Sequence, residues 1–250
     1  MFRCNDDVPE GNRDVQQRPA VLLIHGFGGN RSEVRPLADH LRGSGFEVIS
    51  VQLPGHREDR RELGGAEAKS KIWQDHVIRQ LDELRRHSER VVIIGFSMGG
   101  LLAVQAVTRV LDREAAAGET VAMVTINTPV RYWNFVQIFR NIRRGGWTAL
   151  KNYTAHATGK SVLGMWEFQK LLWRTKTRFS KISCPLFVIQ SADDDTVWPC
   201  SAIHILRKSG ERGRMMMFPE GGHQIFGSKD ANEVCETIEE FVRRWASNET

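Results

Sequence analysis

The sequence has few cysteines and no long apolar run. Its four cysteines, Cys4, Cys184, Cys200 and Cys235, are scattered along 250 residues. No two of them have the close spacing of metal ligands, so we expect no metal site and free thiols in a reducing cytoplasm. No stretch approaches the roughly 18 consecutive apolar residues that a membrane-spanning helix needs.

The start of the chain also lacks an apolar segment. Residues 1–18 are polar and include Asp6, Asp7, Glu10 and Asp14, with nothing like the hydrophobic region of a secretory signal. We therefore expect residues 1–18 to be a polar N-terminal tail and the protein to be cytoplasmic. We find neither internal repeats nor low-complexity tracts.

Positive charge is concentrated in one segment. The chain carries a net charge of +5, but residues 131–181 hold eleven Lys or Arg and one acid, Glu167, which leaves about −5 for the remainder. A nucleic-acid partner would require a recognisable binding motif and a strongly salt-dependent contact with phosphates. No such motif is evident, so we expect no nucleic-acid partner and at most a weak contact between the basic segment and an anionic surface.

Short apolar runs alternate with amphipathic stretches along most of the chain, and this alternation predicts an α/β fold. The runs typical of buried strands are Ala20–Ile24, Phe46–Val51, Val91–Ile94, Val121–Ile126, Leu186–Ile189 and Met215–Phe218. The stretches with apolar residues at helical spacing are Val34–Leu41, Ile72–Leu84, Leu101–Leu111, Ala202–Leu206 and Val234–Trp245. We expect a mainly parallel sheet of about six strands with helices on both faces.

One segment breaks this alternation. After Pro129, about fifty residues rich in aromatic side chains pass without a strand signal. A structureless loop of that length is uncommon within a compact domain. We therefore predict a small helical cap at residues 130–180, inserted into a core formed by residues 19–129 and 181–250.

A serine follows the third apolar run in a glycine-rich turn. Val91–Ile94 leads into Gly95-Phe96-Ser97-Met98-Gly99-Gly100, after which a helical pattern begins. This is the G-x-S-x-G pattern in the strand-then-helix context of a nucleophile elbow. The glycines on either side let neighbouring backbone approach closely, and the helix N-terminus favours developing negative charge. We predict that Ser97 is a nucleophile.

A second glycine-rich loop follows the first apolar run. There the sequence reads His25-Gly26-Phe27-Gly28-Gly29. Acyl transfer needs fixed donors for the oxyanion of its tetrahedral intermediate, and we assign this oxyanion hole to the backbone N–H groups of Phe27 and Met98. We expect His25 to support the loop through hydrogen bonds. No G-K-[ST] follows, which argues against a phosphate-binding loop.

A serine nucleophile needs a neighbouring base. His223 follows Gly221-Gly222, after the last predicted strand and before the last predicted helix. Loops at the carboxyl ends of parallel strands meet at one edge of the sheet, so His223 should lie near Ser97. His56 belongs to the same edge, and we expect it to be a structural or pocket residue.

The acid that orients this base should follow the strand at Leu186–Ile189. Three adjacent carboxylates stand there, Asp193, Asp194 and Asp195, and only one of them can orient the imidazole. The strand before the predicted cap ends in Ile126-Asn127-Thr128 and offers no carboxylate. The chain order Ser, Asp, His is the order expected when the nucleophile stands on such a strand-to-helix turn, but these residues alone leave the choice of aspartate open.

Together these motifs resemble the small bacterial carboxylesterases and monoacylglycerol-lipase-like members of the α/β-hydrolase superfamily. The resemblance covers about residues 20–245. The matching pieces are His25-Gly26-Phe27, Leu53-Pro54-Gly55-His56, Gly95 through Gly100, Asp194 through Pro199 and Gly221-Gly222-His223. In that family the acid stands three residues before a valine and five before a proline, so the resemblance selects Asp194. It also implies a helical lid at residues 130–180.

The resemblance implies a serine carboxylesterase that hydrolyses esters of short- to medium-chain acids through an acyl-enzyme on Ser97. Such chemistry needs neither a metal nor an organic cofactor. Monoacylglycerol lipase and thioesterase activity are alternatives, and so is a non-catalytic ligand-binding or signalling protein on the same fold. Ser97 argues against the aspartate-based chemistry of dehalogenases and epoxide hydrolases. The aromatic residues of the cap either line an acyl pocket or form the cap's own core.

Overall fold

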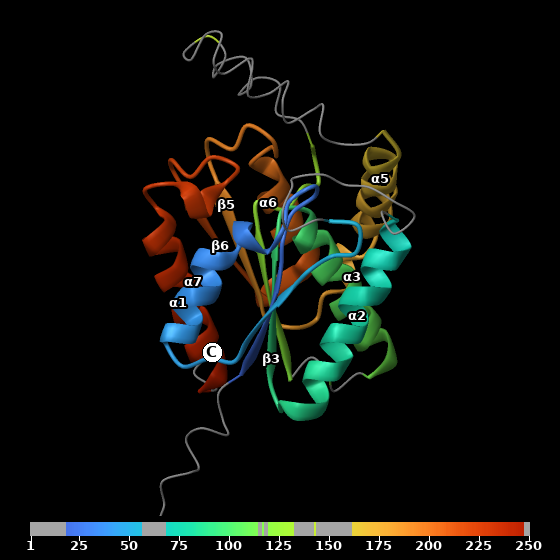
Figure 1. Ribbon diagram of the computed structural model, residues 1–250, viewed down its shortest axis with the longest axis vertical. Helices are drawn as coiled ribbons and strands as arrows, with labels where there is room; N and C mark the ends of the chain where they lie inside the picture. Colours follow the sequence, from blue (N-terminus) through green and yellow to red (C-terminus); the bar gives the residue numbers. More distant parts are fainter. Residues whose placement is uncertain are drawn as a thin grey trace, which may run out of the picture.

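A sheet of parallel strands runs through the centre of the molecule (Figure 1). The computed structural model describes residues 19–56, 69–114, 117, 120–132, 143 and 162–247. Within these ranges the sheet has six strands in the order β2-β1-β3-β4-β5-β6, and every neighbouring pair is parallel. The strands are β1 (Ala20–Ile24), β2 (Val48–Val51), β3 (Val91–Phe96), β4 (Val121–Ile126), β5 (Leu186–Ser191) and β6 (Gly213–Phe218). All six predicted strands are confirmed.

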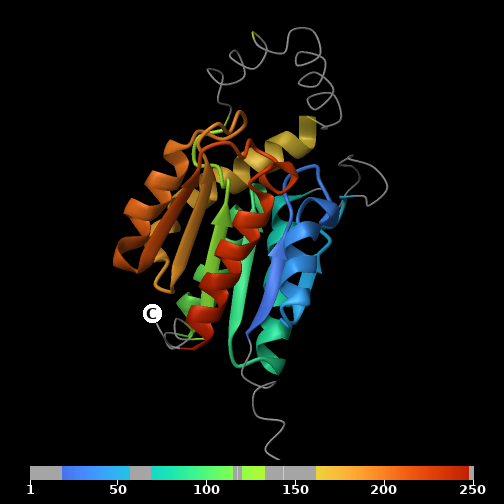
Figure 2. The same cartoon turned by 90° about the vertical axis from the view of Figure 1, so that its left-hand side faces the viewer.

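Helices cover both faces of this sheet, as the sequence predicts (Figures 1 and 2). One face carries α1 (Arg35–Gly43) and α7 (Ala231–Ala246), which lie in front of the sheet in Figure 2. The other face carries α2 (Ser70–His87), α3 (Met98–Arg113) and α6 (Cys200–Ser209). The short 3-10 helices are η1 (Arg31–Glu33), η3 (Phe179–Lys181), η4 (Gly210–Arg212) and η5 (Ile225–Gly227).

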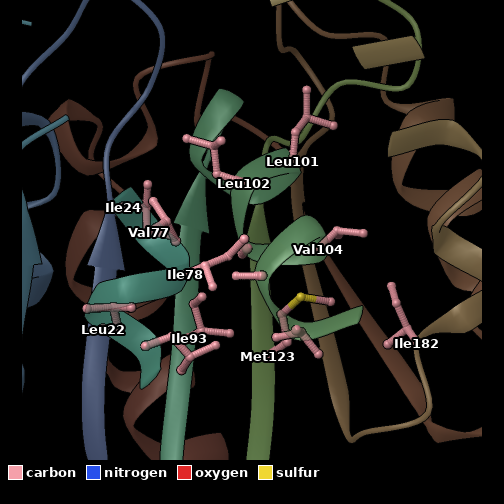
Figure 3. Packing of buried hydrophobic residues seen from close by; sticks show 14 of the residues in the cluster. Leu22, Ile24, Val77, Ile78, Ile93, Leu101, Leu102, Val104, Met123 and Ile182 are labelled. Carbon is pink, nitrogen blue, oxygen red and sulfur yellow. The ribbon is translucent and has the colours of Figure 1, made fainter. Parts of the chain in front are cut away.

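Alternate residues of the central strands enter two separate apolar cores. In β1, Leu22 packs toward α2 and α3, whereas Val21 packs toward α1 and α7. Figure 3 shows Leu22, Ile93 and Met123, from three neighbouring strands, in the cluster that α2 and α3 cover. Because both faces are buried, the central strands are continuous apolar runs rather than alternating ones. The core thus fixes the strands whose carboxyl ends carry the candidate site.

A further helix, α5 (Val162–Lys176), comes from the predicted cap and packs on the core. It lies against α2 and α3, and its Phe168 and Leu171 belong to the same buried cluster as the face of the sheet. The other parts of the predicted cap, residues 133–142 and 144–161, lie outside the described residues. The polar tail at residues 1–18 also lies outside them, so the division into tail, core and cap stays a prediction.

Two further findings concern the residues that the structure describes. None of their helices is both long enough and apolar enough to span a membrane. Their cysteines, Cys184, Cys200 and Cys235, are free thiols, as expected. Burial raises the pKa of the Cys184 thiol to about 12, so this thiol stays protonated at neutral pH.

Candidate active site

Ser97 occupies a strained turn between β3 and α3. Its φ of 52° and ψ of −118° are unusual for a residue with a side chain, and such strain typically costs about 1–3 kcal/mol. The turn is also tightly packed. A Cβ on Gly95 would lie 2.3 Å from the Gly99 carbonyl oxygen, and one on Gly99 would lie 2.2 Å from the Ile24 carbonyl oxygen. Glycine is therefore required on both sides of Ser97, which explains the sequence motif physically.

The structure brings Ser97, His223 and Asp194 into one hydrogen-bonded row. The Nε2 of His223 lies 3.1 Å from the Ser97 Oγ. The Nδ1 of His223 lies 2.9 Å from Asp194 Oδ2 and 3.1 Å from Asp194 Oδ1. Asp194 is fully buried, and Ser97 is buried with 5% of its surface exposed. A neutral imidazole that donates through Nδ1 leaves Nε2 free to accept the hydroxyl proton of Ser97.

The three adjacent aspartates take different positions. Asp194 Oδ1 accepts hydrogen bonds from the backbone N–H groups of Thr196 and Val197, both at 2.8 Å, which fix the carboxylate under His223. Asp193 Oδ1 accepts from the N–H of Gly222 at 2.7 Å. The Asp195 carboxylate accepts from the Thr196 hydroxyl. The carboxylate behind the imidazole is therefore Asp194, the one that the family resemblance selects.

Two opposing effects set the pKa of His223. Burial, the largest effect, disfavours the charged imidazole and lowers its pKa. The charge and hydrogen bond of Asp194, with smaller contributions from the charges of Asp195 and Glu33, outweigh burial and raise the pKa above its ordinary value. A raised pKa strengthens the imidazole as a proton acceptor at neutral pH.

The two residues predicted for the oxyanion hole lie on adjoining backbone. Met98 is the first residue of α3, where helix N–H groups lack partners within the helix. Phe27 lies in the loop after β1, whose last residue, Ile24, pairs with Gly95. A Cβ on Gly99 would lie 2.8 Å from the carbonyl oxygen of His25, so the start of α3 packs directly on the first residue of this loop. The roles of Phe27 and Met98 as oxyanion donors stay predictions.

Two neutral histidines lie at the loop after β1. His25 is fully buried; its Nδ1 donates to the Gly26 carbonyl at 2.9 Å, and its Nε2 accepts from the N–H of Leu53 at 3.3 Å. Burial, and then the nearby His56, lower the pKa of His25 to about 3. Burial also lowers the pKa of His56 to about 4, and its ring contacts His25 edge to face. His25 thus makes the hydrogen bonds expected of a residue that supports the loop, whereas the role of His56 as a structural or pocket residue stays a prediction.

Glu33 links the loop after β1 to the loop between β6 and η5, residues 219–224, which is called the His223 loop below. This role of Glu33 was not predicted from the sequence. Its Oε2 accepts from the N–H of Gly26 at 3.0 Å, and its Oε1 accepts from Gln224 Nε2 at 3.2 Å. A Cβ on Gly29 would lie 2.1 Å from Glu33 Oε2. The signal in the sequence was Gly29 itself, because a glycine in a loop often marks a close approach.

The helix α5 reaches the loop after β1 through aromatic contacts. Phe168 stacks on Phe27 with ring centroids 5.2 Å apart, and Tyr132 meets Phe168 edge to face at 4.9 Å. The buried Glu167 anchors the helix, because its Oε2 accepts from both the N–H (3.1 Å) and the hydroxyl (2.8 Å) of Ser70 at the start of α2. Sequence periodicity gave no signal for this contact between residues 97 positions apart.

No group of three or more His, Cys, Asp or Glu side chains gathers as metal ligands would within the described ranges. The predictions that the protein uses neither a metal nor a cofactor are not tested by this observation.

A serine, a histidine and an aspartate, joined in this order at the carboxyl edge of a parallel sheet, define the class of α/β-hydrolase sites. The chain belongs to the alpha/beta hydrolase family, whose model matches residues 21–237.

Two curated proteins illustrate its relatives. The chain is 23% identical to a carboxylesterase of Bacillus subtilis (strain 168) over 238 residues, which cover 90% of this chain and 92% of that protein. It is 24% identical to a thermostable monoacylglycerol lipase of Bacillus sp. (strain H-257) over 194 residues, which cover 73% of each.

Solved structures share the fold. The monoacylglycerol lipase of Paleococcus ferrophilus superposes with a TM-score of 0.68 at 18% identity, covering 91% of this chain and 96% of that one. An esterase from Exiguobacterium antarcticum superposes with a TM-score of 0.64 at 16% identity, covering 90% and 92%.

The opposing effects on His223 predict the outcome of a titration. In Asp194→Asn the negative charge that raises the pKa is lost while burial persists, so the pKa of His223 should fall below its value in the unmodified protein. Nuclear magnetic resonance of the imidazole protons measures both values. An unchanged pKa would show that Asp194 does not act on His223 in solution.

Proposed function

We propose that this protein is a serine carboxylesterase that hydrolyses carboxylic esters of short- to medium-chain acids. The observation that carries the proposal is the hydrogen-bonded row in which His223 lies 3.1 Å from Ser97 Oγ and 2.9 Å from Asp194 Oδ2. The names of the two Bacillus relatives, a carboxylesterase and a monoacylglycerol lipase, support ester substrates.

The proposed reaction proceeds through an acyl-enzyme. Ser97 Oγ attacks the ester carbonyl carbon while its proton passes to His223 Nε2, and Asp194 stabilises the resulting imidazolium. The backbone N–H groups of Phe27 and Met98 bind the oxyanion. The tetrahedral intermediate collapses, His223 protonates the departing alcohol, and the acyl group stays on Ser97. Water then attacks this ester with His223 as base, which releases the acid and restores the hydroxyl.

Two other enzyme activities are consistent with the same residues. A monoacylglycerol lipase would hydrolyse a glycerol ester, and a thioesterase would release a thiol instead of an alcohol. A binding protein on the same fold would need none of the Ser97–His223 geometry.

The buried free thiols of Cys184 and Cys235 support a reducing location, and we propose that the protein acts in the cytoplasm.

Removing the nucleophile tests the proposal. Ser97→Ala should abolish turnover of p-nitrophenyl butyrate, because loss of a triad member typically costs about 10⁶ in kcat. The rate is measured from the absorbance of the p-nitrophenol released at neutral pH. Ser180→Ala, at an exposed serine after α5, is the matched control and should keep the full rate. Near-normal turnover by Ser97→Ala would refute the assignment.

We further propose that α5 makes a weak contact with anionic lipid surfaces. Leu163, Trp166 and Trp173 are 59%, 63% and 74% exposed, and their spacing places them on one side of the helix. The last turn of α5 adds the exposed cations Arg174 and Lys176. Exposed tryptophans beside cations are typical of helices that lie at an anionic membrane surface.

A vesicle assay tests this contact. Co-sedimentation with vesicles that contain phosphatidylglycerol should be measurable at low salt and lost at about 1 M salt, where the Debye length is about 3 Å. Replacing Trp166 and Trp173 by serine should abolish it, whereas Met216→Ser, at an exposed methionine on β6, should not. Equal binding to purely zwitterionic vesicles would contradict an electrostatic contact.

A further inference from the structure

Asn127 occupies a strained and fully buried position directly after β4. Its φ of 46° lies in the left-handed region, and none of its surface is exposed. Asparagine tolerates this region better than most residues that carry a side chain, but the conformation is still uncommon. Surrounding contacts must therefore hold Asn127 in place. The expected ester hydrolysis assigns this residue no role.

Both ends of the Asn127 amide are used. Its Nδ2 donates to the carbonyl oxygens of Gly222 at 3.0 Å and His223 at 2.9 Å, with a longer contact of 3.3 Å to Ser191 Oγ. Its Oδ1 accepts from the N–H of Ser191, the last residue of β5, at 2.8 Å. A reversed amide would set an oxygen against two carbonyls, so only this orientation satisfies the hydrogen bonds. Asn127 thus ties the ends of β4 and β5 to the His223 loop.

The His223 loop reaches the imidazole through a pair of glycines. The two residues before it, Gly221 and Gly222, have no side chains that could pack, and Gly222 has a φ of 58°. The backbone of this turn is instead held by hydrogen bonds. Asp193 accepts from the N–H of Gly222. Asn127 donates to the carbonyl oxygens of Gly222 and His223, which belong to the peptide groups before and after the His223 Cα.

The backbone next to Asn127 holds the nucleophile. The N–H of Ser97 donates to the carbonyl oxygen of Ile126 at 2.8 Å. Two consecutive residues at the end of β4 therefore bind the backbone of both Ser97 and His223. A displacement of the His223 loop would directly change the 3.1 Å between His223 Nε2 and Ser97 Oγ, and a misplacement of about 1 Å can cost about 10² in rate.

We propose that Asn127 is a positioning residue that holds His223 at proton-transfer distance from Ser97. Its hydrogen bonds go to the backbone of the His223 loop and to Ser191, and not to the reacting atoms. This inference rests on the proposed function and adds a residue to the same site. The amide has two tasks at once, since the Ser191 contact fixes the end of β5, three residues before Asp194.

Two substitutions separate the amide from the backbone strain. Asn127→Gly accepts the positive φ without strain but removes all the side-chain hydrogen bonds. Asn127→Asp keeps the shape and the acceptor for Ser191, but a carboxylate cannot donate to the two loop carbonyls and a protonated acid can donate to only one of them. We expect each to lower kcat by about 10² while KM for p-nitrophenyl butyrate stays nearly unchanged. Circular dichroism at the assay temperature establishes that the variants are folded.

Thr125→Val is the matched control. Thr125 lies two residues earlier, is equally buried, and its Oγ1 has no hydrogen-bond partner within the part of the chain described. This variant should keep the normal kcat. Unchanged kcat in folded Asn127→Gly, beside a wild-type protein whose hydrolysis depends on Ser97, would overturn the positioning role and leave the proposed function intact.

A readout without substrate keeps the two proposals distinguishable. In Asn127→Gly a displaced imidazole makes a weaker contact with Asp194, so its pKa, followed by nuclear magnetic resonance, should fall relative to the unmodified protein. Such a fall would support the positioning role even if the wild type hydrolysed no ester, in which case only the proposed function would fail. A pKa equal to that of the unmodified protein would contradict the positioning role.

Discussion

The close packing of backbone around Ser97 is the constraint on which the site depends. The turn between β3 and α3 closes only because Gly95 and Gly99 have no side chains, and Ser97 itself accepts an unfavourable φ of 52°. Strain of this kind persists only when the surrounding structure compensates for it. The apolar runs of β1 and β3, buried on both faces, supply the rigid support. The same closeness brings the start of α3 against the loop that carries Phe27.

Electrostatics then give the row of side chains its direction. The fully buried Asp194 accepts hydrogen bonds from the backbone N–H groups of Thr196 and Val197. Its charge and its hydrogen bond to the imidazole outweigh the burial of His223 and raise the pKa of that histidine. His25 and His56 show the opposite case, because they lack a carboxylate partner among the described residues and burial holds their pKa values low. Neighbouring charge, rather than burial alone, therefore separates the candidate base from His25 and His56.

Much of this arrangement was predictable from the sequence. Unbroken runs such as Val91–Ile94 indicate strands covered on both faces, and the G-x-S-x-G motif needs a strand before it and a helix after it. The positions of Ser97 and His223 at one edge follow from the parallel order of the strands. The choice of Asp194 among three adjacent aspartates required a family resemblance, because the three side chains are chemically identical.

Long-range polar contacts were not predictable in the same way. Glu33, Asn127 and Glu167 each join segments that are distant in sequence, and a polar residue has no periodicity that reveals its partner. Asn127 was noted only because it is not a carboxylate. Its role depends on the path of the His223 loop. Gly221 and Gly222 have no side chains, so no side-chain pattern predicts that path. Nor does the spacing of aromatic residues in α5 predict that Phe168 stacks on Phe27 while Trp166 and Trp173 are exposed.

The covalent step on Ser97 is tested by rapid quenching with acid during turnover of p-nitrophenyl butyrate, followed by mass spectrometry of the digested protein. We expect a butyryl group on the peptide that contains Ser97, formed as p-nitrophenol is released and lost as butyric acid appears. A butyryl group on another residue would contradict an acyl-enzyme on Ser97. Turnover in which even the fastest quenching captures no acyl group on Ser97 would contradict it as well.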